Sequence, residues 1–173
     1  RGPRDGSPVV FLDHLAAVLD NWDPRVVDGI ATKHRVIAFD NRGVGGSDDP
    51  GGPFTTADLA RDTLGLLDAL GIAKADLLGV FLGGMVAQEM ALAAPDRVDR
   101  LVLVGTWARP DRKRRMLISH WAQRVRSGAP LVSLAVDRLL WTLEDDTLEQ
   151  TDLMDAMMEF FARDALPLSS ELF

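Results

Sequence analysis

A chain of 173 residues is long enough for one domain with a substantial core, and 47% hydrophobic and 26% charged residues are typical of globular proteins. The net charge of −7 argues against nucleic acid or an anionic membrane as a partner, and the absence of cysteine excludes disulfides and thiolate metal sites. No apolar run approaches the roughly 18 residues of a membrane span, and the polar opening does not resemble a signal peptide, so we expect a cytoplasmic protein.

The first two thirds of the chain alternate between strand and helix patterns. Short apolar runs predict four strands, at 8–12, 35–40, 75–78 and 100–104. Capped or amphipathic segments predict three helices between and after them, at 24–32, 56–70 and 82–94. This alternation is typical of right-handed βαβ units, so we predict an α/β fold with a parallel sheet covered on both faces.

After residue 107 the pattern changes to helices alone, predicted at 111–127, 130–143 and 151–165. The acidic residues at 144–146 are expected to separate the last two. Met154, Met157 and Met158 make the third helix too apolar for a free surface; packing is favoured for them over a cofactor site, and an apolar pocket lining has the same spacing. We therefore predict a core over 1–107 and a helical cap over 108–173.

The most informative stretch leads from the third strand into the third helix. Gly79-Val80-Phe81-Leu82-Gly83 matches the frame G-x-S-x-G of a nucleophile elbow, a sharp turn in which glycines relieve the strained backbone. The central position, which carries the nucleophile in such a turn, is Phe81, and phenylalanine has no nucleophilic atom. The sequence therefore predicts the backbone of a catalytic turn without its reactive side chain.

Several phrases around this turn resemble, in order and spacing, the α/β-hydrolase superfamily, and above all its small bacterial esterases, lactonases and haloperoxidase-like enzymes. The resemblance covers about 8–105, and its phrases are 9–15, 21–24, 36–47, 76–87 and 95–98. It implies a partial α/β-hydrolase core with a cap. It also implies an ancestral action on carboxylic esters, thioesters or lactones, with no cofactor and no metal.

The resemblance also assigns positions to a site. By position it implies an oxyanion hole from the backbone N–H groups of Leu15 and Leu82, an elbow turn at Gly79 and Gly83, and a pocket lined by His14 and Trp107. In the family the triad acid and histidine follow on later strands, and this chain ends at Phe173 before them. The chain thus resembles a fragment that lacks strands at both ends, and we predict it to be inactive.

No other residues are expected to replace the missing acid and base. His34 is expected to be solvated and His120 to pack on a cap helix, whereas His14 lies in the right loop. There, shaping the oxyanion turn is favoured over accepting a proton. Asp40 and Arg42 are expected to hold their loop by hydrogen bonds.

Other chemistries fit the sequence less well. Asp111, the nearest carboxylate after the fourth strand, is expected to cap a helix. The glycine-rich loop 41–46 lacks the lysine of a phosphate-binding P-loop and is followed by no dinucleotide fingerprint. Metal ligands at useful spacing are absent.

Three hypotheses remain. The first is a hydrolase relative of altered or partial sequence, whose partner is a small apolar ester- or lactone-like molecule. The second is a pseudoenzyme that binds an apolar small molecule in a pocket with Phe81 at its floor. The third is a domain completed by another polypeptide, in which uncovered sheet edges allow self-association.

Overall fold

A computed structural model describes residues 1–15, 17–129, 133, 137, 145–152, 154–156 and 159. The chain divides into two compact units, 1–109 and 110–173. No helix among the described residues is both long and apolar enough to cross a bilayer.

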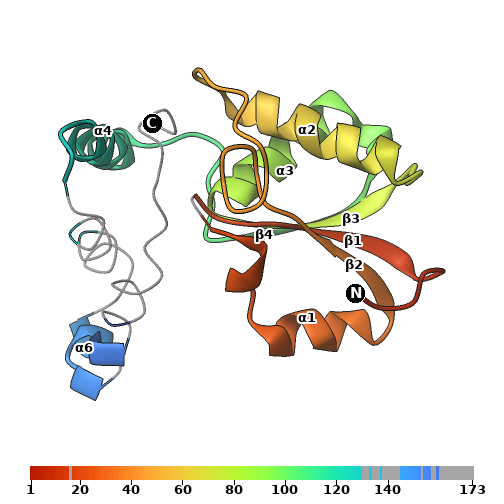
Figure 1. Ribbon diagram of the computed structural model, residues 1–173, viewed down its shortest axis with the longest axis horizontal. Coiled ribbons are helices and arrows are strands. Elements are labelled where there is room, and N and C mark those ends of the chain that lie inside the picture. The colour runs from red at the N-terminus through yellow and green to blue at the C-terminus, as the bar shows by residue number, and fades with distance from the viewer. Residues whose placement is uncertain are drawn as a thin grey trace. The chain divides into compact units, whose positions relative to one another are not determined.

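The first unit is built on a four-stranded parallel sheet (Figure 1). Its strands lie in the order β2-β1-β3-β4, and every neighbouring pair is parallel. The strands are β1 (Ser7–Leu12), β2 (His34–Ala38), β3 (Ala75–Val80) and β4 (Val98–Val104). The predicted parallel sheet is confirmed. The strand ends differ from the predicted ones by one or two residues, the usual uncertainty where hydrogen-bonded pairing stops.

Helices cover both faces of the sheet. The helix α1 (Pro24–Ala31) lies on one face, and α2 (Thr56–Ala69) and α3 (Leu82–Ala93) lie together on the other (Figure 1). The larger core packs Val10, Leu12 and Leu77 of the strands against α2 and α3, and the smaller core packs Val9, Phe11 and Val36 against the side of α1. This division follows from the strand pleat, which sends alternate side chains to opposite faces.

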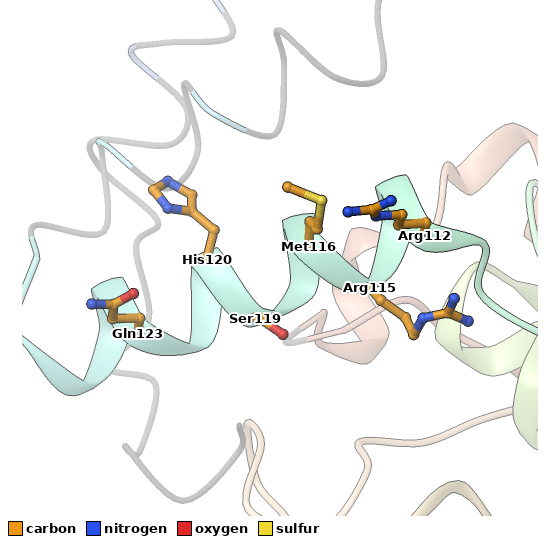
Figure 2. A pocket seen from close by; sticks show the side chains of 6 residues that line it. All are labelled: Arg112, Arg115, Met116, Ser119, His120 and Gln123. Carbon is orange, nitrogen blue, oxygen red and sulfur yellow. The ribbon is translucent and has the colours of Figure 1, made fainter.

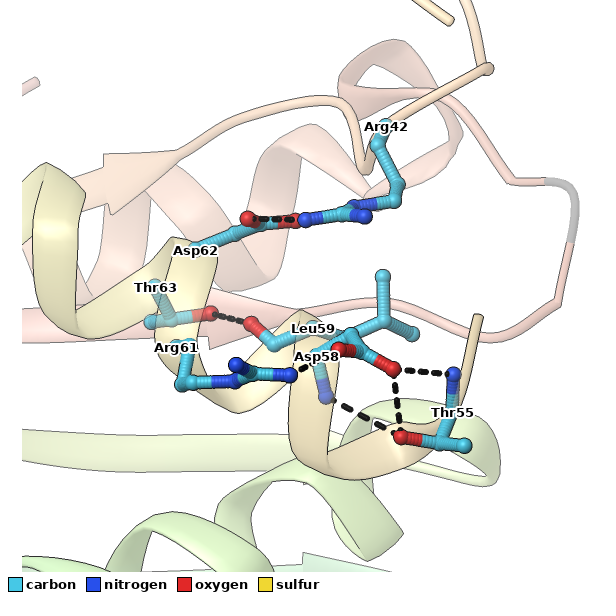
Figure 3. A network of polar contacts seen from close by, with 7 residues as sticks. All are labelled: Arg42, Thr55, Asp58, Leu59, Arg61, Asp62 and Thr63. Atoms are coloured by element: carbon cyan, nitrogen blue, oxygen red, sulfur yellow. Dashed lines mark hydrogen bonds and ion pairs between the residues drawn. The ribbon is translucent and has the colours of Figure 1, made fainter. Parts of the chain in front are cut away.

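The predicted helix starts are confirmed by their capping contacts. The Asp23 carboxylate accepts a hydrogen bond from the backbone N–H of Arg25, with Pro24 at the first helical position of α1. Thr55 and Asp58 form a reciprocal capping box at the start of α2 (Figure 3). Two short 3₁₀ turns, η1 (Leu19–Asn21) and η2 (Pro95–Arg97), were not evident from the sequence pattern.

The two edges of the sheet differ. At the β2 edge, the backbone N–H of Val36 donates to the carbonyl of Arg1 at 2.8 Å, and the terminal amine of Arg1 donates to the carbonyl of Val36 at 2.9 Å. At the β4 edge, the side chains from Leu101 to Val104 are exposed by 38–52%. The start of the chain thus covers one edge, while the other presents apolar side chains to solvent.

The second unit begins with α4 (Arg112–Arg126), whose N-cap is Asp111 as predicted. The acidic run at 144–146 was expected to separate two helices, and a short helix, α6 (Asp145–Leu148), begins within it and includes two of its residues. Acidic side chains are stabilised in the first turn of a helix by its dipole, so this run starts a helix. The predicted helices at 130–143 and 151–165 fall largely outside the described residues.

Candidate active site

The order of the strands creates a switch point between β1 and β3. From β1 the chain crosses to β2 on one side, and it then returns to β3 on the other side of β1. Ligands of open parallel sheets bind beyond the carboxyl ends of the strands at such a point. The residues that follow β1 and β3 there are Asp13 and His14 on one side and Phe81 on the other.

Phe81 has the backbone conformation of a strained elbow. It separates β3 from α3 with φ +49° and ψ −108°, and it is the only non-glycine residue with positive φ in the part of the chain that the structure describes. Such a conformation costs on the order of 1–3 kcal/mol and persists only where the surroundings impose it.

The end of β4 and the residues after it hold this turn through hydrogen bonds to both the N–H and the carbonyl of Phe81. The Phe81 N–H donates to the carbonyl of Val104 at 3.0 Å, and the Phe81 carbonyl accepts from the Thr106 hydroxyl at 2.7 Å. The same carbonyl accepts from the N–H of Gly84 at 3.1 Å. Thr106 is thus a positioning residue of the elbow.

Glycines allow the strand, the turn and the helix to approach one another closely. A β-carbon on Gly79 would lie 2.5 Å from the carbonyl oxygen of Gly83, and one on Gly83 would overlap the carbonyl oxygen of Leu12. A β-carbon on Gly84 would lie 2.6 Å from the side chain of Thr106. Gly79 and Gly83 are the turn glycines that the sequence predicted. Gly84 is a third glycine with the same role, which its position directly after Gly83 could have indicated.

The two predicted oxyanion donors lie after the strands that flank the switch point. Leu82 is the first residue of α3, and the first N–H groups of a helix have no acceptor within the helix. Leu15 follows β1 in a turn in which the N–H of Ala17 donates to the carbonyl of His14 at 3.2 Å. Their joint role as an oxyanion hole stays a prediction.

His14 lies beside Phe81. The two rings are in an edge-to-face arrangement, with centroids 6.4 Å apart. Nδ1 of His14 lies 3.0 Å from the carbonyl oxygen of Leu15, and Nε2 lies 3.8 Å from Oδ1 of Asp13. Asp13 is only 7% exposed, and it accepts a hydrogen bond from the His14 N–H at 2.7 Å. A half-buried His14 and a buried Asp13 therefore adjoin the position that carries the nucleophile in such a turn.

Of the other two histidines, one lies at the opposite end of the sheet and one belongs to the second unit. His34 begins β2, at the amino end of the sheet, and its Nδ1 lies 2.7 Å from the Ser7 hydroxyl. His34 remains partly exposed, and the parallel register adds the neighbouring Ser7 as its contact. His120 belongs to the second unit; its side chain is 55% exposed, with Nε2 3.8 Å from the Asp137 carboxylate, so the expected packing role is wrong.

Asp40 is a loop anchor, as predicted. One carboxylate oxygen accepts from the N–H of Leu19 at 2.7 Å and the other from the N–H of Gly46 at 2.8 Å, while the Asp40 carbonyl accepts from the Ser47 hydroxyl at 2.7 Å. The glycine-rich loop thus surrounds a carboxylate of the protein itself, an arrangement that leaves no place for phosphate binding at this loop.

Arg42 ties the same loop to α2 (Figure 3). Its guanidinium donates two hydrogen bonds, each 2.5 Å long, to the Asp62 carboxylate, and lies 5.7 Å from the centre of the Phe54 ring. The hydrogen bonds to Asp62 raise the pKa of Arg42 above its ordinary value. This contact is structural and supplies no acid or base to the turn at Phe81.

The segment after β4 supplies no carboxylate to the site. Trp107 follows Thr106, and its carbonyl accepts from Nε2 of Gln88 on α3 at 3.5 Å, so the backbone of this segment packs on the elbow helix. A pocket lined by Trp107 stays a prediction. No group of three or more metal-ligating side chains occurs among the residues with described positions.

In the second unit, a hollow of about 400 Å³ lies on α4. Its lining is one stripe of the helix (Figure 2), made up of Arg112, Arg115, Met116, Ser119, His120 and Gln123. The stripe contains no carboxylate, and α4 carries basic residues without a single acidic one. The hypothesis of an enclosed pocket with Phe81 at its floor stays a prediction.

Comparison with known proteins agrees with this geometry. A family model described as the alpha/beta hydrolase fold matches residues 7–139. A protein of Mycobacterium tuberculosis that bears the name non-heme bromoperoxidase BpoC is 38% identical over 127 residues, which are 73% of this chain and 48% of that protein. A Variovorax paradoxus protein named for carbamate hydrolysis, RutD, is 40% identical over 64% of this chain and 42% of its own.

Solved structures extend the similarity to nearly the whole chain. The crystal structure of BpoC superimposes with a TM-score of 0.86 at 32% identity, over 99% of this chain and 64% of that one. An enol-lactonase from Burkholderia xenovorans gives a TM-score of 0.81 at 29% identity, over 99% and 64%.

The elbow, the switch point and these matches together identify the family. The chain belongs to the α/β-hydrolase fold family, as the sequence resemblance implied, and its sheet is part of the core of that fold. It spans less than half the length of the curated relatives that it matches.

Proposed function

We propose that this chain is a non-hydrolytic member of the α/β-hydrolase family, which holds an ester- or lactone-like molecule at the turn after β3 without cleaving it. The observation that carries the proposal is Phe81, which occupies the strained position between β3 and α3. Acyl transfer by this fold needs a nucleophilic oxygen or sulfur at that position, and a benzyl side chain supplies none.

Two observations support the ligand class, namely the backbone N–H groups at the start of α3 and the names of relatives. Backbone N–H groups at the start of a helix favour a carbonyl oxygen or a negative charge. The names of two relatives, a carbamate hydrolase and an enol-lactonase, both describe cleavage next to a carbonyl group. A carbonyl compound with an apolar body fits the rings of Phe81 and His14, which lie edge to face at this place.

A fluorophosphonate probe tests the missing nucleophile. We expect no covalent labelling of the chain and no turnover of p-nitrophenyl esters above the rate in buffer, with a known serine hydrolase as the positive control. Stoichiometric labelling at the elbow would contradict the proposal.

A serine at the elbow tests whether a base is also missing. We expect Phe81→Ser to remain inactive, because a serine hydroxyl needs an adjacent base at neutral pH. Both ring nitrogens of His14 face its chain neighbours, Nδ1 the Leu15 carbonyl and Nε2 the Asp13 carboxylate. If Phe81→Ser gains ester cleavage and the double variant Phe81→Ser/His14→Ala loses it again, His14 is a base, and only the nucleophile was absent.

Binding is tested separately from catalysis. A p-nitrophenyl ester or an aliphatic lactone should shift amide resonances around the turn in an NMR titration of the unmodified chain, and the added ligand should remain intact. Unchanged spectra at millimolar ligand would overturn the binding half of the proposal and leave the missing hydrolysis unaffected.

A further inference from the structure

Three consecutive residues, at and just after the end of β4, contact Phe81. The carbonyl of Val104 accepts a hydrogen bond from the Phe81 N–H at 3.0 Å, and the hydroxyl of Thr106 donates one to the Phe81 carbonyl at 2.7 Å. Gly105 lies between them in the left-handed region, with φ of +59°, and a β-carbon there would lie 3.1 Å from the Phe81 ring. The segment 104–106 therefore contacts both the backbone and the side chain of Phe81.

The two hydrogen bonds fix the backbone torsions of Phe81. Its N–H belongs to the peptide unit shared with Val80, and its carbonyl belongs to the unit shared with Leu82. Because each peptide unit is planar, φ and ψ of Phe81 are the rotations that set these two planes relative to each other. Holding both planes imposes the observed φ of +49° and ψ of −108°, a conformation that persists only where the surroundings require it.

The hydrogen bond from Thr106 comes from outside the elbow helix. The Phe81 carbonyl also accepts from the N–H groups of Gly84 at 3.1 Å and of Met85 at 3.3 Å, which belong to the first turn of α3. The bond from Thr106 is shorter than both. Thr106 comes this close because residue 84 is a glycine, since a β-carbon there would lie 2.6 Å from the threonine side chain. The contact is therefore built into the packing of α3 against the end of β4.

The peptide unit that Thr106 holds also carries the N–H of Leu82. No peptide bond is cis in the part of the chain that the structure describes, so this N–H points in the direction opposite to the Phe81 carbonyl. The carbonyl is directed along α3, toward its donors at 84 and 85, and the Leu82 N–H is therefore directed out of the start of the helix. The Leu82 side chain packs against the larger core, which restrains the residue. The direction of this donor thus depends on what holds the Phe81 carbonyl.

We propose that Thr106 is a positioning residue for the ligand and acts through the peptide unit between Phe81 and Leu82. Its hydroxyl holds the Phe81 carbonyl and thereby keeps the Leu82 N–H directed at the carbonyl oxygen of a bound ester or lactone. A carbonyl that accepts a hydrogen bond also polarises its peptide unit, which makes the N–H of that unit a stronger donor. This inference rests on the proposed function, from which it takes the class of ligand.

Amide hydrogen exchange tests the positioning without a ligand. Thr106→Val keeps the branched shape of the side chain and removes the hydroxyl. In this variant we expect the Gly84 N–H to exchange about fivefold faster relative to the Met90 N–H, the factor that corresponds to one lost hydrogen bond. Met90 is a fully buried residue of the same helix, so this ratio separates local opening from global unfolding. Thr106→Ser restores the hydroxyl and should restore the ratio.

The matched control is Thr63→Val. The Thr63 hydroxyl is also buried and also donates to a backbone carbonyl, that of Leu59 at 2.9 Å, but it lies on α2. We expect this variant to leave the ratio of Gly84 to Met90 exchange unchanged. An unchanged ratio in Thr106→Val, or an equal rise in both variants, would overturn the proposal whether or not the chain binds a lactone.

A pair of ligands tests the donor itself. δ-Valerolactone and tetrahydropyran have rings of the same size and differ by a carbonyl group, so the ratio of their affinities reports the contact with the Leu82 N–H. We expect NMR titration to show this ratio falling about fivefold in Thr106→Val and returning in Thr106→Ser, with Thr63→Val unchanged.

The outcomes of this titration separate the two proposals. A purely structural role of Thr106 would weaken the binding of both compounds equally, and an unaltered affinity ratio in Thr106→Val would contradict the inference. If the unmodified chain binds neither compound, the proposed binding function fails together with the ligand half of this inference. The exchange ratio still decides whether Thr106 positions the peptide unit.

Discussion

At the scale of single residues, the turn at Phe81 is held by its neighbours and not by its own side chain. Val104 accepts a hydrogen bond from its N–H, and Thr106 donates one to its carbonyl. The glycines at 79, 83 and 84 lack the β-carbons that would collide with neighbouring backbone or side-chain atoms. A phenylalanine with φ of +49° carries a backbone cost that a glycine would not carry.

This cost can be measured by comparing two variants of the same position. We expect Phe81→Gly to unfold with a free energy about 1 kcal/mol higher than Phe81→Ala, although alanine is the more stabilising residue where φ is negative. Both variants remove the ring, so the loss of packing cancels. Urea unfolding measures the difference, and an alanine variant at least as stable as the glycine variant would show that the turn relaxes in solution.

At the scale of elements, helix starts were the most predictable feature. Asp23 with Pro24, Thr55 and Asp111 were each identified as a start from the residue alone, because a side-chain acceptor before a helix satisfies its free N–H groups. The site was only partly predictable. Phe81, Gly79 and Gly83 follow from a local motif, whereas the contacts of His14 and of Thr106 with Phe81 depend on how the strands pair.

The cap of α1 gives a prediction about pH. The hydrogen bond from the Arg25 side chain, with a second from its backbone, lowers the pKa of Asp23 from 3.8 to about 2. Since the folded-state pKa lies below the unfolded one, the ionised cap stabilises the fold above about pH 4, and this contribution is lost as the pH falls through about 2. In Asp23→Asn the cap persists without titration.

NMR titration of the Asp23 carboxyl carbon should give a midpoint near 2, and Arg25→Gln should move it upward. The stability of the unmodified chain relative to Asp23→Asn should be greatest above pH 4 and should decline toward pH 2. A midpoint near 3.8 in the unmodified chain would mean that the contact with Arg25 is absent in solution.

At the scale of the whole molecule, charge and apolar surface act in opposite directions on association. The chain carries a net charge of −7, which keeps copies apart, while α4 is a strongly basic helix within it. Association through exposed apolar side chains is opposed by the net charge. Association of α4 with acidic segments of another copy would be driven by charge.

Salt separates these two cases. Raising sodium chloride from about 0.05 M to about 0.5 M shortens the range of charge interactions from about 14 Å to about 4 Å and leaves contacts between apolar side chains intact. We therefore expect added salt to strengthen association, as measured by sedimentation equilibrium. Weaker association at high salt would identify contacts between α4 and acidic residues as its cause.

The close approach of Gly83 to Leu12 has a consequence for tolerance to substitution. No side chain fits at Gly83, whatever chemistry the turn performs, because a β-carbon there would meet the β1 backbone. Position 81, by contrast, projects from the turn and accepts a residue as large as phenylalanine. In a chain of this fold the glycine frame is therefore fixed by packing, whereas the residue at its centre can be replaced without loss of the turn.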